Sequence, residues 1–179
     1  MRLDVLSANG VRLSKTYKKT GHGIDAAAYP FVKNFTSHTV EVTTPEEFHR
    51  ATVEHADQGH CLLKGTLAHP VANQPRAGLT NTNAATNWIC IDYDRSDGFS
   101  SVDELLVTLD PALANTTYVF QHSASAGVKG AVGLRGHAFF LLETAVLAPV
   151  LRHWLTGLNY KHAALRDRLE LSTNGLGLR

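Results

Sequence analysis

Two aspartates, Asp92 and Asp94, close the apolar run "WICIDYD" at residues 88–94. Side chains alternate along a strand, so residues two apart project from the same face. Two carboxylates this close repel each other in an apolar setting, and a divalent cation that takes oxygen ligands removes the repulsion. The spacing therefore predicts a Mg²⁺ or Mn²⁺ site at the end of a buried strand. The alternative is a pair of hydrated acids at a fraying strand edge.

A second group of candidate residues lies in "SASAGVKGAVGLRGHAFFLL", residues 123–142. Small and glycine residues here join two expected strands, and backbone N–H groups in such a connection can face phosphate oxygens. Lys129 and Arg135 lie in the connection, and His137 opens the following strand, where its ring can donate to a phosphate. The same pattern also fits a flexible hairpin with a hydrogen-bonded histidine.

Two long cations, Lys64 in "CLLK" and Arg76 in "PRAGLT", precede the aspartate strand. The stretch that holds them, residues 64–86, contains no acid, and both side chains could reach into the same cleft. Ordinary surface residues are the alternative. A second acid-free stretch, "RLSKTYKK" at residues 12–19, reads as a solvated basic loop.

Local signals place these residues on helices and strands. "HTVEVTT" at residues 38–44 alternates as a strand does, and Thr44, Pro45 and Glu47 are typical of the start of a helix that should run to about Asp57. "HCLLKGTL" is a short apolar strand, followed by a long polar loop, which in a compact domain is usually either functional or disordered. The aspartates therefore follow a strand, a helix, a strand and a loop.

The chain after Asp94 shows similar signals. Ser101 and Glu104 form a capping box for a helix that Pro111 ends, and "TTYVFQHS" and "HAFFLLE" are further strands. The order, with one crossover and one hairpin, predicts an α+β fold with a mixed or antiparallel sheet and flanking helices.

Three segments have weaker patterns. The first 36 or so residues show no clear period and are expected to form a loop or a loose arm. Residues 146–170 are expected to be helical, with a break near Gly157, and "STNGLGLR" is expected to end the chain in turns.

The composition is that of an ordinary globular protein. The 179 residues suffice for one domain with a real core, and the net charge of +1 does not by itself indicate a nucleic-acid binder. No apolar run approaches the ~20 residues that span a bilayer, and the first residues lack a secretory h-region, so a cytoplasmic protein without a membrane partner is expected. Cys61 and Cys90 lack metal-ligand spacing and are expected to be buried thiols.

A strand ending in Asp-x-Asp, then a helix, a strand, a Gly-rich hairpin and a strand that begins with histidine, resembles the archaeo-eukaryotic primase superfamily. "ICIDYD" matches the first motif of that family. The segment with Ser123, Ser125, Gly127 and His137 is similar to the looser second motif of phage and plasmid primase-polymerases. "LLKGTL" and "PRAGLT" also resemble the lead-in segments of such enzymes. The resemblance covers roughly residues 61–143.

The resemblance implies a catalytic core with an RRM-like element beside an N-terminal α/β unit, all within residues 1–179. It implies template-directed nucleotidyl transfer on single-stranded DNA from an NTP or a dNTP, in a phage, a plasmid or another mobile element, with a helicase domain or protein as a further partner. The resemblance implies that Asp92 and Asp94 bind Mg²⁺ or Mn²⁺ and that His137 binds a phosphate of the incoming nucleotide. It implies that the same phosphates are also contacted by Ser123, Ser125, Lys129 and Arg135. Lys64 and Arg76 are implied to contact nucleotide or template phosphates.

The chain departs from the family pattern at the third acidic motif. Glu143 lies on the same expected strand as the histidine, and Glu170 lies on an expected helix or at its end, so neither matches. We expect an N-terminal fragment, or a naturally shortened copy, that lacks the third carboxylate.

Two other functions fit the aspartate pair. A metal-dependent glycosyltransferase would use Asp-x-Asp to hold a nucleotide-sugar diphosphate, but it needs a strand-helix repeat before the motif. A non-catalytic nucleic-acid-binding module of a replication protein would use the acids only to end a strand. An origin-nicking initiator needs two histidines separated by one apolar residue, and none of the ten histidines has that spacing.

Overall fold

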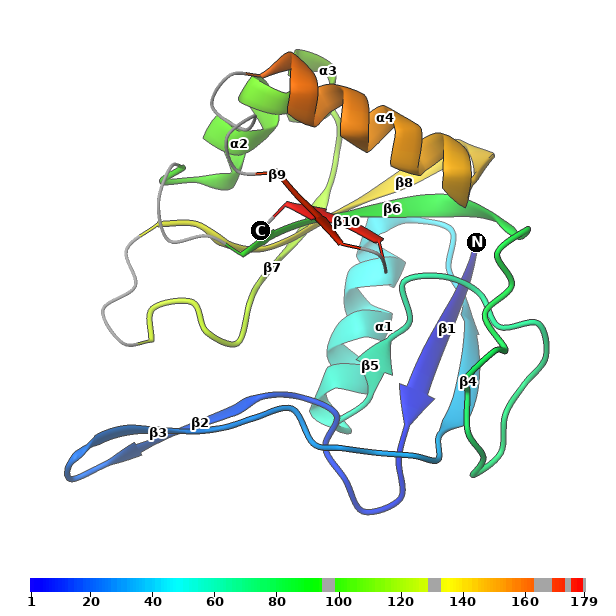
Figure 1. The fold of residues 1–179 in the computed structure, drawn as a ribbon, viewed down its shortest axis with the longest axis vertical. Coiled ribbons are helices and arrows are strands. Elements are labelled where there is room, and N and C mark those ends of the chain that lie inside the picture. Colours follow the sequence, from blue (N-terminus) through cyan, green and yellow to red (C-terminus); the bar gives the residue numbers. More distant parts are fainter. Residues whose placement is uncertain (95–98, 129–132, 163–168, 173–174, 179) are drawn as a thin grey trace. The chain divides into compact units, whose positions relative to one another are not determined.

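The computed structural model describes residues 1–94, 99–128, 133–162, 169–172 and 175–178, without the side chains of Asp94, Asn159 and the residues after His162 (Figure 1). The chain is a mixed α+β protein, as the sequence predicted. It divides into two compact units, residues 1–87 and 88–179, and each is described by itself. The expected single catalytic domain stays a prediction.

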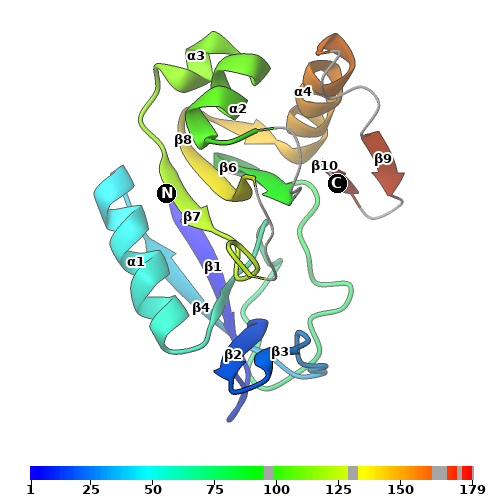
Figure 2. The ribbon, with the colours of Figure 1, turned by 90° about the vertical axis from the view of Figure 1, so that its left-hand side faces the viewer.

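The N-terminal unit contains a three-stranded antiparallel sheet in the order β4-β1-β5. β1 (Arg2–Ser7) lies in the middle, with β4 (Thr36–Glu41) on one side and the short β5 (Cys61–Leu62) on the other. β4 and β5 confirm two predicted strands. Helix α1 lies beside this sheet in both views (Figures 1 and 2).

The expectation of a loop or loose arm over the first 36 residues is wrong for β1. Its residues Leu3, Asp4, Val5 and Leu6 are all buried, so this strand is the centre of the unit's core. The segment also contains a hairpin of β2 (Thr16–Thr20) and β3 (Gly23–Ala27). β1 escaped detection because it is only six residues long and carries a buried acid in the middle of its apolar pattern.

Helix α1 (Pro45–Asp57) has the predicted bounds and the predicted N-cap. The Thr44 hydroxyl accepts the backbone N–H of Glu47 at 3.2 Å. The Glu47 carboxylate reaches back one residue further than a capping box requires, and accepts the N–H and the hydroxyl of Thr43 at 2.8 and 2.7 Å. These bonds lower the pKa of Glu47.

The long polar segment after β5 is held to the sheet by a buried carboxylate. Asp4 accepts the backbone N–H of Leu67 at 2.9 Å, the hydroxyl of Thr39 at 3.1 Å and the guanidinium of Arg2 at 2.9 and 3.2 Å. A buried carboxylate is stable only when paired in this way. The segment is therefore an ordered loop.

The C-terminal unit contains a five-stranded sheet in the order β7-β8-β6-β10-β9. Its strands are β6 (Ala85–Asp94), β7 (Val119–His122), β8 (Arg135–Leu147), β9 (Leu169–Ser172) and β10 (Gly175–Leu178). β7 pairs antiparallel with β8, and β10 pairs parallel with β6. The three predicted strands β6, β7 and β8 are thus confirmed, whereas β10 replaces the expected C-terminal turns.

Three helices lie on one side of this sheet (Figure 1). They are α2 (Val102–Leu109), α3 (Pro111–Ala114) and α4 (Ala148–Lys161). The core between them and the sheet contains Leu105 and Leu106 from α2, Leu158 from α4, and Ile91 and Phe140 from the strands. One face of the sheet therefore packs against the three helices.

The helix predictions for this unit are partly right. Ser101 caps α2 as predicted, with its hydroxyl accepting the N–H of Glu104 at 3.2 Å. Pro111 does not simply end a helix, because it begins the short α3, which Asp110 caps. α4 runs without a break through Gly157 and ends at Lys161, so the expected helix to Glu170 is wrong and Glu170 lies in β9.

In the described part of the chain, no helix has the length and apolar character needed to cross a membrane.

Candidate functional site

Strand β6 places Asp92 on the side of the sheet away from the helices. Ile89, Ile91 and Tyr93 are 7%, 2% and 1% exposed and belong to the core under the helices. The side chain of Asp92 lies between two of them in sequence and is 43% exposed. Alternation along the strand therefore puts the carboxylate on the opposite face.

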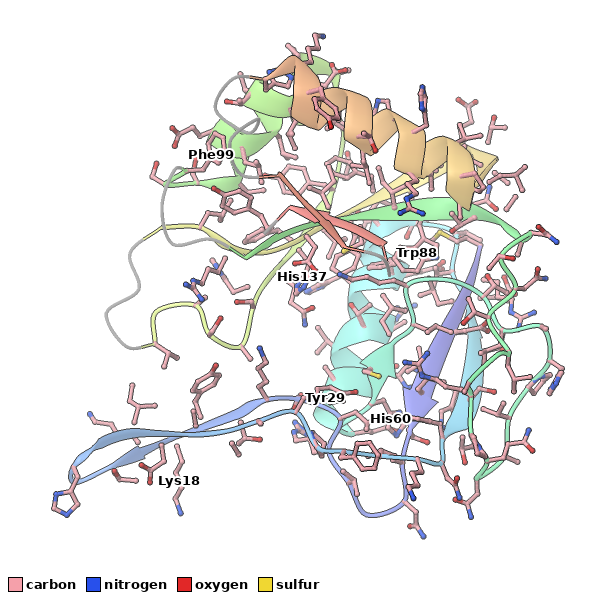
Figure 3. All side chains as sticks on the ribbon, in the orientation of Figure 1. Lys18, Tyr29, His60, Trp88, Phe99 and His137 are labelled. Carbon is pink, nitrogen blue, oxygen red and sulfur yellow. The ribbon has the colours of Figure 1, made fainter. Side chains whose placement is uncertain are left out.

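Strand β8 places His137 on that same face. Its neighbours Gly136 and Ala138 are buried, and Ala138 belongs to the core under the helices. His137 pairs with Gln121 of β7, and Figure 3 shows its ring on the side of the sheet opposite the helices. Because β8 is the immediate neighbour of β6 in the sheet, the histidine and the aspartate come from adjacent strands.

The two side chains contact each other. His137 Nε2 lies 3.3 Å from Asp92 Oδ1, and the ring is 25% exposed. The other ring nitrogen, Nδ1, is buried and has no hydrogen-bond partner among the described residues. The ring also stacks near Phe139, with centroids 6.1 Å apart. The imidazole Nε2 thus faces the Asp92 carboxylate.

The Gly-rich connection begins with a tight turn that brings both predicted serines to Arg135. Ser123 Oγ lies 3.0 Å from Ser125 Oγ, and Arg135 Nη1 lies 3.4 Å from Ser125 Oγ. The backbone N–H of Ser123 donates to the carbonyl of Arg135 at 3.0 Å. Gly127, with φ of +71°, allows the chain to turn back. Arg135 and His137 are two residues apart on one strand, so their side chains share a face.

The structure therefore joins five predicted site residues in two adjoining groups: Asp92 with His137, and Ser123 with Ser125 and Arg135. Lys129 and the side chain of Asp94 lie outside the described residues.

Lys64 and Arg76 belong to the N-terminal unit, where both are exposed. The guanidinium carbon of Arg76 stands 5.5 Å from the centre of the Phe35 ring. Their expected part in the same cleft stays a prediction.

The described residues supply only part of the ligand set that the metal hypothesis requires. Among the described residues, no group of three or more His, Cys, Asp or Glu side chains could hold a metal ion. Because the Asp94 side chain is not among them, the paired carboxylates stay a prediction. Glu143 is exposed further along β8, and only the backbone of Glu170 is described. The carboxylate of Asp92 is the type of ligand that Mg²⁺ or Mn²⁺ binds, but it is only one of the several ligands that such an ion needs.

Sequence reasoning missed a cluster of three histidines in the N-terminal unit. His38 of β4 stacks on His60 with centroids 4.9 Å apart, and His55 of α1 lies 5.2 Å from His60. The Nδ1 atoms of His55 and His60 are 2.9 Å apart, and Ser7 Oγ lies 2.8 Å from His38 Nε2. Burial, and then the charge of His38, lower the pKa of His55 and of His60. No single motif signals this cluster, because His38 lies in β4, His55 in α1 and His60 in the connection before β5.

Comparison with protein-family models, with curated proteins and with solved structures found no match to this chain.

Proposed function

We propose that this chain carries the nucleotide-binding site of a metal-dependent, primase-type nucleotidyltransferase. The observation that supports this most is the contact of Asp92 with His137 on adjacent strands, on the sheet face that the helices leave uncovered. A strand-end carboxylate beside a strand-initial histidine is what the primase resemblance implies. The substrate class is a nucleoside or deoxynucleoside triphosphate, and the reaction is templated transfer to a 3′-hydroxyl.

The order of elements in the C-terminal unit supports the same proposal. β6, the helices α2 and α3, β7, β8, α4 and a last strand follow one another as β-α-β-β-α-β, and β8 lies between β6 and β7. This is the arrangement of split β-α-β folds, to which an RRM-like core would belong. The parallel pairing of β10 with β6 and the extra strand β9 depart from that arrangement.

Each residue of the site has a role that its position allows. Asp92, with Asp94, would hold Mg²⁺ or Mn²⁺, which when bound offsets the charge of the triphosphate and activates the attacking hydroxyl. His137, when protonated, adds a positive charge held in place by Asp92. Arg135 and Ser125 lie beside it and can donate to phosphate oxygens. The site thus combines carboxylates that can bind a metal ion with three side chains that can donate hydrogen bonds to phosphate.

The two rival functions are less well supported. A nucleotide-sugar transferase with a Rossmann-like lead-in needs a parallel sheet before the aspartates, whereas β1, β4 and β5 pair antiparallel. A non-catalytic nucleic-acid-binding module would use the acids only to end a strand, and does not call for the contact of Asp92 with His137. Both rivals remain as outcomes of the test below.

Thermal unfolding of the full chain distinguishes the three functions. A dNTP with Mn²⁺ should raise the unfolding temperature, because a ligand that binds only the folded state stabilises it. His137→Gln should remove most of that rise. His153→Gln, which changes an exposed histidine on α4, should leave it unchanged. A rise with UDP-sugar and Mn²⁺ instead would favour the transferase, and no rise with either ligand would favour the module.

A further inference from the structure

In the described part of the chain, β2 and β3 of the N-terminal unit pair only with each other. They form a separate two-stranded sheet, with Thr16 opposite Ala27 and Thr20 opposite Gly23, and this hairpin extends from its unit as a narrow ribbon (Figure 1). All five residues of β3 are exposed. A two-stranded hairpin without a covered apolar face is only marginally stable in water. Packing in the protein core therefore does not account for the types of residue found in the hairpin.

The strand register sorts the hairpin side chains onto two faces. On one face Lys18 is opposite Asp25, so that a cation and an anion are neighbours. On the other face Lys19 is opposite Ile24 and Tyr17 is opposite Ala26. That second face combines an aromatic ring, apolar surface and a positive charge, with Ile24 40% exposed. We call it the Tyr17 face.

Positive charge is concentrated in and around the hairpin. Residues 12–33 contain five Lys or Arg residues and one acid, in a chain whose net charge is only +1. Lys15, Lys18, Lys19 and Lys33 are all exposed, and Figure 3 shows Lys18 projecting from the ribbon. Arg12 is engaged nearer the body of the unit, where it donates to the carbonyl of Asp57 at 3.0 Å. The ribbon therefore presents a local positive field to a polyanion.

Exposed aromatic rings continue past the hairpin. Tyr29 is 47% exposed and Phe31 is 88% exposed, the highest value among the large exposed apolar side chains of the described residues. The Phe31 ring buries apolar area when it stacks on a flat ligand, whereas the Tyr29 hydroxyl already donates to Cys61 Sγ at 3.6 Å. Lysines alternate with these rings, since Lys33 follows Phe31 and Tyr17 lies between Lys15 and Lys18.

We propose that the Tyr17 face and the segment Tyr29–Lys33 bind single-stranded DNA. Unpaired bases stack on aromatic rings while lysines contact the phosphates, and this combination is typical of single-strand binders. Base pairs in a duplex are already stacked on each other, and an acidic protein would use the lysines but not the rings. The inference rests on the proposed function only for the choice of DNA over RNA, since the proposed enzyme class uses a single-stranded DNA template.

Fluorescence anisotropy of a labelled oligonucleotide of about 20 deoxythymidines tests this, since single-strand sites span roughly 4–16 nucleotides. The full chain is titrated without metal or nucleotide, so the result does not depend on catalysis. Lys18→Ala with Lys19→Ala should weaken binding at least about fivefold and lower the salt slope by roughly 0.7 for each lost phosphate contact. Tyr17→Ala should weaken binding by roughly fivefold or more.

The matched control removes two charges elsewhere. Arg152→Ala with Lys161→Ala changes the net charge equally, on exposed residues of α4, and should change the affinity less than about twofold. The proposal is overturned if the wild-type chain does not bind the oligonucleotide, if the two double variants lose affinity equally, or if a duplex or polyglutamate binds as tightly.

Hydrogen exchange of the wild-type chain gives a second readout that needs no variant. Added oligodeoxythymidine should slow exchange in residues 16–27 and 29–33. Protection elsewhere with none in these two segments would also overturn the proposal. Failure of dNTP and Mn²⁺ to stabilise the chain, with DNA binding at the hairpin intact, would count against the nucleotidyl-transfer proposal alone.

Discussion

His137 Nε2 lies 3.3 Å from Asp92 Oδ1, and the two residues come from strands β8 and β6, which are neighbours in the sheet. They are 45 positions apart in the sequence, and the alternation of each strand places them on the face away from the helices. A partly exposed ion pair of this kind contributes little to stability, about 0–1 kcal/mol. Because the contact contributes so little to stability, we take its position in the sheet as support for a role in binding.

Gly136→Ala should destabilise the protein by about 1–3 kcal/mol. Gly136 precedes His137, and a Cβ there would run into the Phe120 ring and lie 2.6 Å from the carbonyl oxygen of Gln121. Urea unfolding measures the change. Gly157→Ala is the control, since its Cβ meets nothing within 4 Å inside α4, and it should stabilise by about 0.5–1 kcal/mol. Equal effects of the two changes would contradict the packing of β7 on β8.

Asp4→Leu should lower the free energy of unfolding by about 3 kcal/mol or more, because it leaves the buried N–H of Leu67 without its acceptor and removes the partner of Arg2. Asp4→Asn keeps one oxygen and should cost less. Chemical denaturation checks both. A fully stable Asp4→Leu protein would show that the loop after β5 does not depend on this carboxylate.

The histidine cluster predicts a loss of stability in mild acid. The pKa values of His55 and His60 are lowered from 6.5, so the folded protein binds protons less readily than the unfolded chain. The free energy of unfolding should therefore be at its full value above pH 6.5 and should fall as the pH drops below it, until these groups are charged in the folded state as well.

Urea unfolding between pH 7.5 and 5 measures this fall, and His55→Gln with His60→Gln should make the curve flatter. His49→Gln changes an exposed histidine of the same helix and should leave the slope unchanged. A double variant with the wild-type slope would place the acid sensitivity elsewhere.

Elements with strong local signals were predictable. α1 and α2 each begin with a hydroxyl that accepts an N–H three residues on, and β6 has a dense apolar pattern, so short stretches of sequence suffice to define them. Asp92 and His137 were chosen as candidates for a similar reason, because both lie in strands with dense apolar patterns.

Features that depend on distant residues were not predictable. β1 is a strand because β4 and β5 pair with it, and Glu170 lies in a strand because β10 pairs with β9. The Asp92–His137 contact required the knowledge that β8 lies beside β6, and the three histidines meet only after folding. Long-range pairing therefore decided what the local pattern left open.

Paramagnetic broadening of histidine signals by Mn²⁺ tests the central claim most directly. In the NMR spectrum of the full chain with a dNTP, Mn²⁺ should broaden the ring signals of His137, assigned through His137→Gln, before those of His153 on α4. Asp92→Asn should abolish the effect, whereas Glu143→Gln, which changes an exposed acid on β8, should preserve it. Equal broadening of both histidines, or unchanged broadening in Asp92→Asn, would contradict a metal and nucleotide site at Asp92.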